Sequence, residues 1–391
     1  MASKIKVDTL ETANGSGSIT INNPINTAGI TSVTLGTSNF VAGVNAGNSI
    51  TSGGNYNTVV GDEAGTAITT GDRNSAVGMS ALVANTTGSF NAALGYESLK
   101  ANTTGGQNTG LGDRTLLANT TGALNTAVGQ GSLAANTTAS NNVAVGVAAL
   151  EANTTGTENV AVGASALTDN TTNGYNTAVG FESLKVNTTG NKNTAVGRKS
   201  LAANTTGIEN VAVGYDCLDA NTTASGNTAI GKSALGANTT GASNTSVGKS
   251  ALQLNTTGAN NTASGFEALR YNTTGARNVA IGEGALYSNT TATNNTVIGT
   301  YAGDGVTTGI ANILIGYQAG KYNTPLTTGT ENTIIGAYAY PSASDTSSAN
   351  ALGYNIIAVS GYTTIGSATN DIRAAHGNTT WATVSDERYK K

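Results

Sequence analysis

The chain has 391 residues and a net charge of −4, with 52 glycines, 10% charged residues, one histidine and one cysteine. One His and one Cys cannot supply the several ligands of a zinc or iron–sulfur site, so we expect no metal or cofactor. The sequence has no basic cluster, which argues against nucleic acid as a partner. It has no run of about 20 apolar residues, which argues against insertion into a membrane. We therefore expect an ordered chain that is not an enzyme.

Residues 1–50 lie outside the repeat that dominates the rest of the chain. Alternating stretches at 18–21 and 32–35, set among Gly, Asn and Pro24, predict short strands. No apolar run follows Met1, so we expect no secretory signal and a chain that folds in the cytoplasm where it is made. We interpret residues 1–50 as an N-terminal anchoring region.

Residues 51–320 contain sixteen repeat units, each seventeen residues long. Each unit has a Gly with an Asn four residues before it, and in thirteen consecutive units a Leu follows the Gly by four residues and a second Asn by seven. The consensus is Asn-Thr-Ala-Val-Gly-x-x-Ala/Ser-Leu-x-x-Asn-Thr-Thr-Gly-x-x. Residues that represent these structural positions are Asn57, Gly61, Asn125, Gly129, Leu133, Asn136, Asn210, Gly214, Asn312 and Gly316.

The repeat predicts an all-β fold, a parallel β-roll or β-helix solenoid. Seventeen residues are too few for a domain, so each unit must bury its apolar face against its neighbours. In Asn-Thr-Ala-Val-Gly one face carries Thr or Val and the other carries Asn and Ala, which predicts a strand that the Gly ends. The segment Ala-Leu-x-x-Asn fits either a second short strand or one helical turn, and Thr-Thr-Gly-x-x predicts a turn.

Stacked coils place identical residues above one another. We expect Asn ladders whose side-chain amides bond from coil to coil in the interior. Ala-rich small faces would let three rods approach closely, which favours a homotrimer. Cys217 occupies a position that is Ala or Ser in other units, so we expect a small buried residue.

Residues 321–385 form a C-terminal tip region in which the repeat breaks. Eight of the fourteen tyrosines lie from Tyr301 onward, together with the single Trp. Exposed aromatic rings offer stacking area with a polar tip, which suits recognition of sugars or proteins. Packing of a trimeric cap is an equally good explanation of these rings. The candidate receptor contacts are Tyr338, Tyr340, Tyr354, Tyr362 and Trp381.

The repeat resembles those of phage tail fibres and, more distantly, the head domains of trimeric autotransporter adhesins, over about residues 57–336. The first eleven residues are similar to the starts of fibre proteins from marine tailed phages. The last seven residues, Ser-Asp-Glu-Arg-Tyr-Lys-Lys, resemble the opening of the endosialidase-type intramolecular chaperone of phage tail spikes and fibres. That resemblance implies a self-cleavage junction between Ser385 and Asp386, with 386–391 as a remnant. Three explanations for the missing chaperone stay open: the chain is truncated, the chaperone is supplied separately, or the motif is a relic.

These resemblances imply a structural virion protein, a homotrimeric tail fibre assembled in the host cytoplasm. Its N-terminus would bind other tail or adaptor proteins of the virion. Its C-terminal tip would bind a polysaccharide or protein of the host surface. The alternatives are an architectural fibre or decoration protein that touches no receptor, a bacterial adhesin and an ice-binding solenoid.

Overall fold

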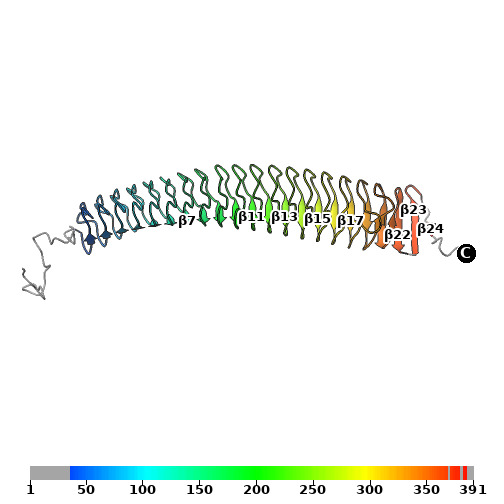
Figure 1. Ribbon diagram of the computed structural model, residues 1–391, viewed down its shortest axis with the longest axis horizontal. Helices are drawn as coiled ribbons and strands as arrows, with labels where there is room; N and C mark the ends of the chain where they lie inside the picture. Colours follow the sequence, from blue (N-terminus) through cyan, green and yellow to red (C-terminus); the bar gives the residue numbers. More distant parts are fainter. Residues whose placement is uncertain (1–35, 369, 379–381, 385–391) are drawn as a thin grey trace, which may run out of the picture.

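The computed structural model describes residues 36–368, 370–378 and 382–384, and this part of the chain forms one long curved rod without helices (Figure 1). Each coil of the rod contributes one short strand, and the strands lie side by side along one edge of the rod. The expected parallel β-solenoid is therefore confirmed. Within the described residues the buried side chains form one continuous column along the rod, because each coil buries its interior only against its two neighbours.

The strands are mostly three residues long. In chain order they are β1 Phe40–Ala42, β2 Thr58–Val60, β3 Ser75–Val77, β4 Ala92–Leu94, β5 Thr109–Leu111, β6 Thr126–Val128, β7 Val143–Val145, β8 Val160–Val162, β9 Thr177–Val179, β10 Thr194–Val196, β11 Val211–Val213, β12 Thr228–Ile230, β13 Thr245–Val247, β14 Thr262–Ser264, β15 Val279–Ile281, β16 Thr296–Ile298, β17 Ile313–Ile315, β18 Thr333–Ile335, β19 Tyr340–Pro341, β20 Asn350–Tyr354, β21 Ile357–Ala358, β22 Tyr362–Ser367, β23 Asn370–Ala375 and β24 Ala382–Val384.

Strands β1 to β18 pair in chain order, all parallel and in equivalent register. The parallel stack continues through β20 and β22, and antiparallel pairing of β23 and β24 then ends it. Strands β19 and β21 form a separate small sheet. The stack begins before residue 51 and continues beyond residue 320, so the observed shaft is longer at both ends than the 51–320 expected from the repeat.

The middle residue of each strand points into the coil and its two neighbours point outward. Ala127 is completely buried, whereas Thr126 and Val128 on either side of it are partly exposed. The same pattern holds for Ala144 and Ala161 in the next coils. The expectation that Ala-rich faces lie outside and contact other rods is therefore wrong, because the Ala side chains fill the narrow interior of a single chain.

The segment after the strand is neither a second strand nor a helical turn but a series of tight turns. Leu133 has a left-handed backbone with φ of +51°, and its side chain is completely buried. Such a conformation costs a non-glycine residue about 1–2 kcal/mol. Burial of the Leu side chain contributes about 1.5–3 kcal/mol, which offsets that strain. The turn is also bonded to the next coil, since Leu133 N donates to Ala149 O at 3.0 Å.

The Gly that ends each strand is required for two reasons. Gly129 has φ of +113°, a region that side chains disfavour. A Cβ on it would lie 2.7 Å from the backbone carbon of Gly146 in the next coil. The prediction that this Gly ends the strand is confirmed.

Two Asn ladders run through the interior, as expected. In the first ladder, the backbone N and Nδ2 of Asn125 donate to Oδ1 of Asn108 at 3.0 and 3.1 Å. In the second, Nδ2 of Asn136 donates to Oδ1 of Asn119 at 2.7 Å. The Asn125 and Asn136 amides also donate to Ala139 O, at 2.9 and 3.1 Å. The ladders thus bond each coil to its neighbour and also close the turn within the coil.

The other representative residues occupy the same columns. Asn57 N donates to Asn39 Oδ1 at 2.7 Å, Asn210 N to Asn193 Oδ1 at 3.0 Å, and Asn312 N to Asn295 Oδ1 at 2.9 Å. Gly61, Gly214 and Gly316 all have positive φ and end strands. Cys217 is buried, with Sγ 3.2 Å from Ala229 O, which confirms its expected place.

Candidate functional site

Tyrosine rings gather on the turns near the C-terminal end of the rod. Tyr317 follows the Gly that ends β17, Tyr338 comes two residues after the Gly that ends β18, and Tyr354 follows the corresponding Gly of β20. Because successive coils stack, these three rings become neighbours. Ring centroids of Tyr317 and Tyr338 lie 5.2 Å apart, and those of Tyr338 and Tyr354 lie 5.9 Å apart, both edge to face.

Two further tyrosines complete this group. The coil between the starts of β17 and β18 is three residues longer than the regular repeat, and its longer turn carries Tyr322. The Tyr322 ring lies 5.0 Å from that of Tyr338 and 5.9 Å from that of Tyr340. Tyr317, Tyr322, Tyr338, Tyr340 and Tyr354 are called the tyrosine cluster below.

The tyrosine cluster is partly buried by its own members. Tyr338, at its centre, is only partly exposed, and this burial raises the pKa of its phenol. Tyr317 and Tyr354 remain exposed at the surface. Edge-to-face pairs of this kind contribute about 0.5–1.5 kcal/mol each beyond the area they bury. The cluster is therefore a firm aromatic surface with phenol groups available to a ligand.

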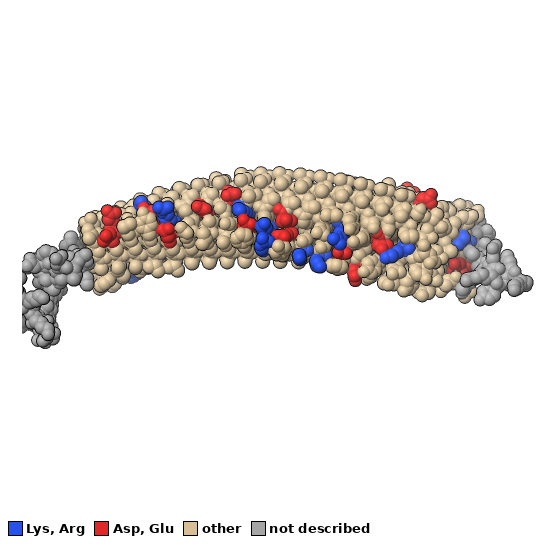
Figure 2. Space-filling model, viewed as in Figure 1, with Lys and Arg blue, Asp and Glu red and all other residues tan. Residues whose placement is uncertain are grey.

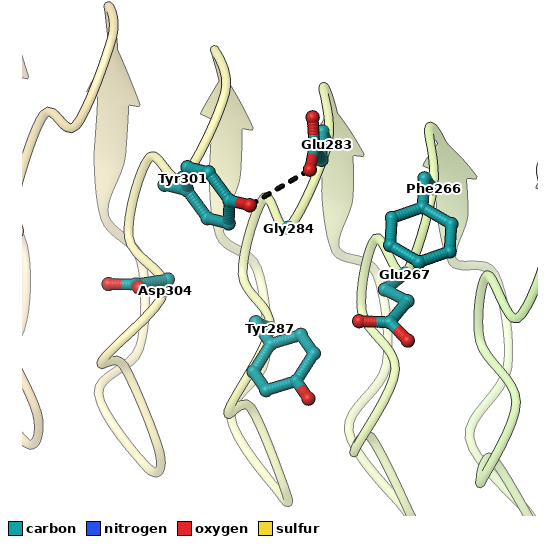
Figure 3. A pocket seen from close by; sticks show the side chains of 7 residues that line it. All are labelled: Phe266, Glu267, Glu283, Gly284, Tyr287, Tyr301 and Asp304. Carbon is teal, nitrogen blue, oxygen red and sulfur yellow. Dashed lines mark hydrogen bonds between the residues drawn. The ribbon is translucent and has the colours of Figure 1, made fainter.

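A small hollow lies beside the cluster, on the turns that follow β14, β15 and β16 (Figure 3). Its volume is about 220 Å³, and it is lined by Phe266, Glu267, Glu283, Gly284, Tyr287, Tyr301 and Asp304. Gly284 makes the hollow possible, because a Cβ at this position would lie 2.7 Å from the Tyr301 ring. Ligand sites for drug-sized molecules are usually about 300–1,000 Å³, so this hollow suits a single small ring.

The carboxylates of the hollow differ in their partners. Glu267 pairs with Arg270 and Asp304 with Lys321, each at 2.5 Å. Glu283 instead accepts a hydrogen bond from the Tyr301 hydroxyl at 2.8 Å, and this bond raises the pKa of Tyr301 (Figure 3). Aromatic faces beside carboxylate acceptors and phenol groups suit a polyhydroxylated ring, which presents C–H groups to the rings and O–H donors to the carboxylates.

The structure brings together some of the predicted contact residues and not others. Tyr338 and Tyr354 touch, and Tyr340 joins them through Tyr322. Tyr362 lies on β22, where the Arg373 guanidinium lies 5.9 Å from the centre of its ring. Within the described residues its ring contacts no member of the tyrosine cluster. Trp381, Ser385 and Asp386 lie outside the described residues.

The lining of the hollow was not predicted from the sequence. Its signal was nevertheless present, because Glu283 lies one repeat length after Phe266 and Tyr301 lies one repeat length after Gly284. Aligning the units by the strand-ending Gly places these side chains in adjacent columns. The sequence prediction relied instead on the number of aromatic residues, which is highest near the C-terminus.

Across the residues that the structure describes, no three His, Cys, Asp or Glu side chains gather where they could hold a metal ion. His376 is exposed, with Nε2 3.3 Å from Asn350 Nδ2. No helix in the described part of the chain is long and apolar enough to cross a membrane. Comparison with protein-family models, with curated proteins and with solved structures finds no match for this chain.

Proposed function

We propose that this protein is a structural virion component, a homotrimeric tail fibre that mediates attachment to the host cell surface. The carrying observation is a continuous rod that presents a cluster of aromatic residues toward one end. About 19 stacked coils at about 4.8 Å per strand give a shaft of roughly 90 Å. In this proposal, residues 1–50 bind tail or adaptor proteins of the virion.

The tyrosine cluster and the neighbouring hollow form the host-binding surface in this proposal. A hollow sized for one ring gives a weak contact, because a small ligand offers little binding energy above the entropy lost on association. Three copies on one fibre add avidity, since the second and third contacts form at high effective concentration. A surface polysaccharide, which repeats the same ring many times, suits such a multivalent fibre.

Adsorption competition tests this function. Purified full-length protein should block adsorption of phage that carry this fibre to their host cells. A Tyr338→Ala and Tyr354→Ala double variant should compete at least tenfold less well. Tyr175→Ala is a matched control, because this exposed tyrosine lies in mid-shaft, away from the cluster. Unchanged adsorption at saturating wild-type protein would rule out host attachment.

An architectural fibre without receptor contact is the second candidate. The mutual packing of the tyrosine rings favours it, since rings that bury one another also stabilise the end of a shaft. Antibody labelling of virions in the electron microscope separates the two candidates. Label at a position that never meets the host during adsorption would support the architectural role.

A further inference from the structure

The outward side of the strands forms a long face that carries no charge. In every strand from β1 to β18 the first and third residues point outward, and they define the strand face. The third residue is Val, Ile or Leu in all but two of these strands, and the first residue is most often Thr or Val. None of these outward residues is Asp, Glu, Lys or Arg.

Charged side chains border this face on both sides. One bordering column lies two residues before each strand and the other lies two residues after it. The first column includes Arg73, Glu158, Lys192, Glu209, Arg277 and Glu331, and the second includes Asp62, Asp113, Arg198, Lys232, Lys249 and Glu283. An apolar centre with a polar rim is the usual anatomy of a protein–protein interface. Figure 2 shows that charged side chains are sparse on the face of the rod that it presents.

The strand face is large enough to form one side of a protein–protein interface. Eighteen strands at about 4.8 Å make it roughly 85 Å long, and three residues make it roughly 10 Å wide, or about 850 Å². A standard interface buries about 800 Å² per partner. Leu111 and Ile230 on this face are 42% and 41% exposed in the single chain.

We propose that the strand face is the surface through which three parallel copies of this chain associate about a common axis. A partner must repeat at the spacing of the strands along the whole shaft, and another copy of the chain does so. The face has two columns, so each copy can pack its Val and Ile column against the Thr and Val column of the next. A heterologous contact forms a closed ring only when the rotation between neighbouring copies permits it, and the trimer proposed above takes three copies for this ring.

The proposal rests on the trimeric fibre proposed above and identifies the surface that builds it. Light scattering on the full-length protein should give about three times the chain mass of 38.7 kDa. A Leu111→Lys and Ile230→Lys variant should fall to the mass of a single chain, because charges opposite one another would be desolvated at the axis. Both side chains are half-exposed, so the coils should keep their circular dichroism spectrum.

The matched control is a Thr121→Lys and Leu254→Lys variant. Both residues are exposed and lie in turns outside the strand face, and Leu254 is 38% exposed. This variant should keep the trimeric mass. A wild-type monomer or dimer, or a strand-face variant that stays trimeric, would overturn the proposal.

Adsorption distinguishes this proposal from the proposed attachment function. Suppose that the wild-type protein is a trimer, that the strand-face variant is not, and that the wild-type protein does not compete for adsorption. This result would support the proposed interface and reject the proposed attachment function. A wild-type monomer that does compete would reject the interface and leave attachment standing.

Discussion

The coils in the middle of the rod and those near its ends fill the same cross-section with different side chains. The coil of β6 uses Ala127 in the strand, Leu133 in the turn and Asn136 beyond it, all buried. The coil of β2 uses Val59, Gly65 and Ile68 at the equivalent positions. Where Leu is lost, the strand residue and the ladder residue both become larger and apolar.

The same exchange occurs toward the C-terminal end. The coil of β16 has Val297, Gly303 and Val306, and a Cβ on Gly303 would lie 2.7 Å from Leu314 Cδ1 and 3.3 Å from Val297 Cγ1. Larger aliphatic residues thus occupy the space that Leu fills in the middle coils. Packing to constant volume explains why the three positions change together.

The difference between the regions follows from how a ladder ends. An interior Asn needs a donor from the coil on one side and an acceptor from the coil on the other. Asn289 is the last member of the second ladder, and Val306 follows it, so its buried Oδ1 has no hydrogen-bond partner. A coil with Val or Ile at the ladder position needs no hydrogen-bond partner there, so it can occupy the part of the stack where the repeat changes or ends.

The strand-ending Gly is common to both regions, and its replacement should have the largest effect. Gly129→Ala places a Cβ against the next coil at a φ that Ala disfavours, and we expect a loss of about 3 kcal/mol or more. Urea unfolding followed by circular dichroism measures it. The control is Gly236→Ala in a turn, because a Cβ there would lie 3.4 Å from Asp219 Oδ1 and the equivalent positions in other coils carry Ala134 and Ala202. Equal losses for both variants would contradict the requirement.

The interior of the Asn ladder should be more sensitive than its end. Asn136→Ala removes a donor to Asn119 Oδ1 and an acceptor for Asn153 Nδ2, which lie at 2.7 and 3.1 Å. At about 1–3 kcal/mol for each orphaned group, we expect a loss of roughly 2–5 kcal/mol. Asn289→Ala breaks a single ladder bond, that to Asn272, and should cost about half as much. Equal losses in urea unfolding would refute the ladder's dependence on both neighbours.

The pH dependence of stability at Cys217 reports whether water reaches the interior in the middle of the rod. Burial raises the pKa of its thiol to about 12, from 9.0. Below pH 9 the thiol is neutral in both states. Above pH 9 only the unfolded state ionises, so wild-type stability should fall relative to Cys217→Ser by about 1.4 kcal/mol per pH unit until about pH 12. Parallel stability curves for the two proteins up to pH 11 would mean that the thiol is hydrated.

Conversion of an end coil into a middle coil should have the smallest effect. Val306→Asn gives Asn289 Oδ1 its missing donor, and Gly303→Leu with Val297→Ala restores the side chains of a middle coil. Leu314→Val is added because Leu314 Cδ1 would otherwise lie 2.7 Å from the new Cβ at residue 303. We expect this quadruple variant to gain about 1 kcal/mol in urea unfolding, the net contribution of one hydrogen bond. Val306→Asn alone should destabilise, because it buries a polar group beside unfilled space. If Val306→Asn alone stabilises the protein, the ladder hydrogen bond forms without any change in the surrounding apolar side chains, which would contradict this prediction.

The solenoid could be predicted because its period is written in Asn125, Gly129 and their equivalents. Two features could not. The alternation Thr126-Ala127-Val128 does not say which face is inside. The ordinary rule that larger apolar residues are buried fails here, because the buried Leu133 leaves room only for Ala at the strand position of this coil. The left-handed turn at Leu133 was also hidden, because Leu disfavours that conformation and only tertiary packing holds it there.

The candidate site was predicted in part. Tyr338, Tyr340 and Tyr354 could be grouped because aromatic residues become frequent near the C-terminus. The contact through Tyr322 depends on a turn lengthened by three residues, and the hollow at Gly284 depends on which turn columns face each other. Both follow from the three-dimensional stacking of coils, which composition alone does not describe.

Because successive coils stack in equivalent register, the number of repeat units encoded in the gene determines the length of the rod. Inserting or deleting the codons of one repeat unit within the shaft would add or remove one complete coil and leave every ladder bond in place. Each such event would change the length of the rod by one strand spacing, about 4.8 Å. Near-identical units favour misaligned recombination, so the length of the rod could change without redesign of either end.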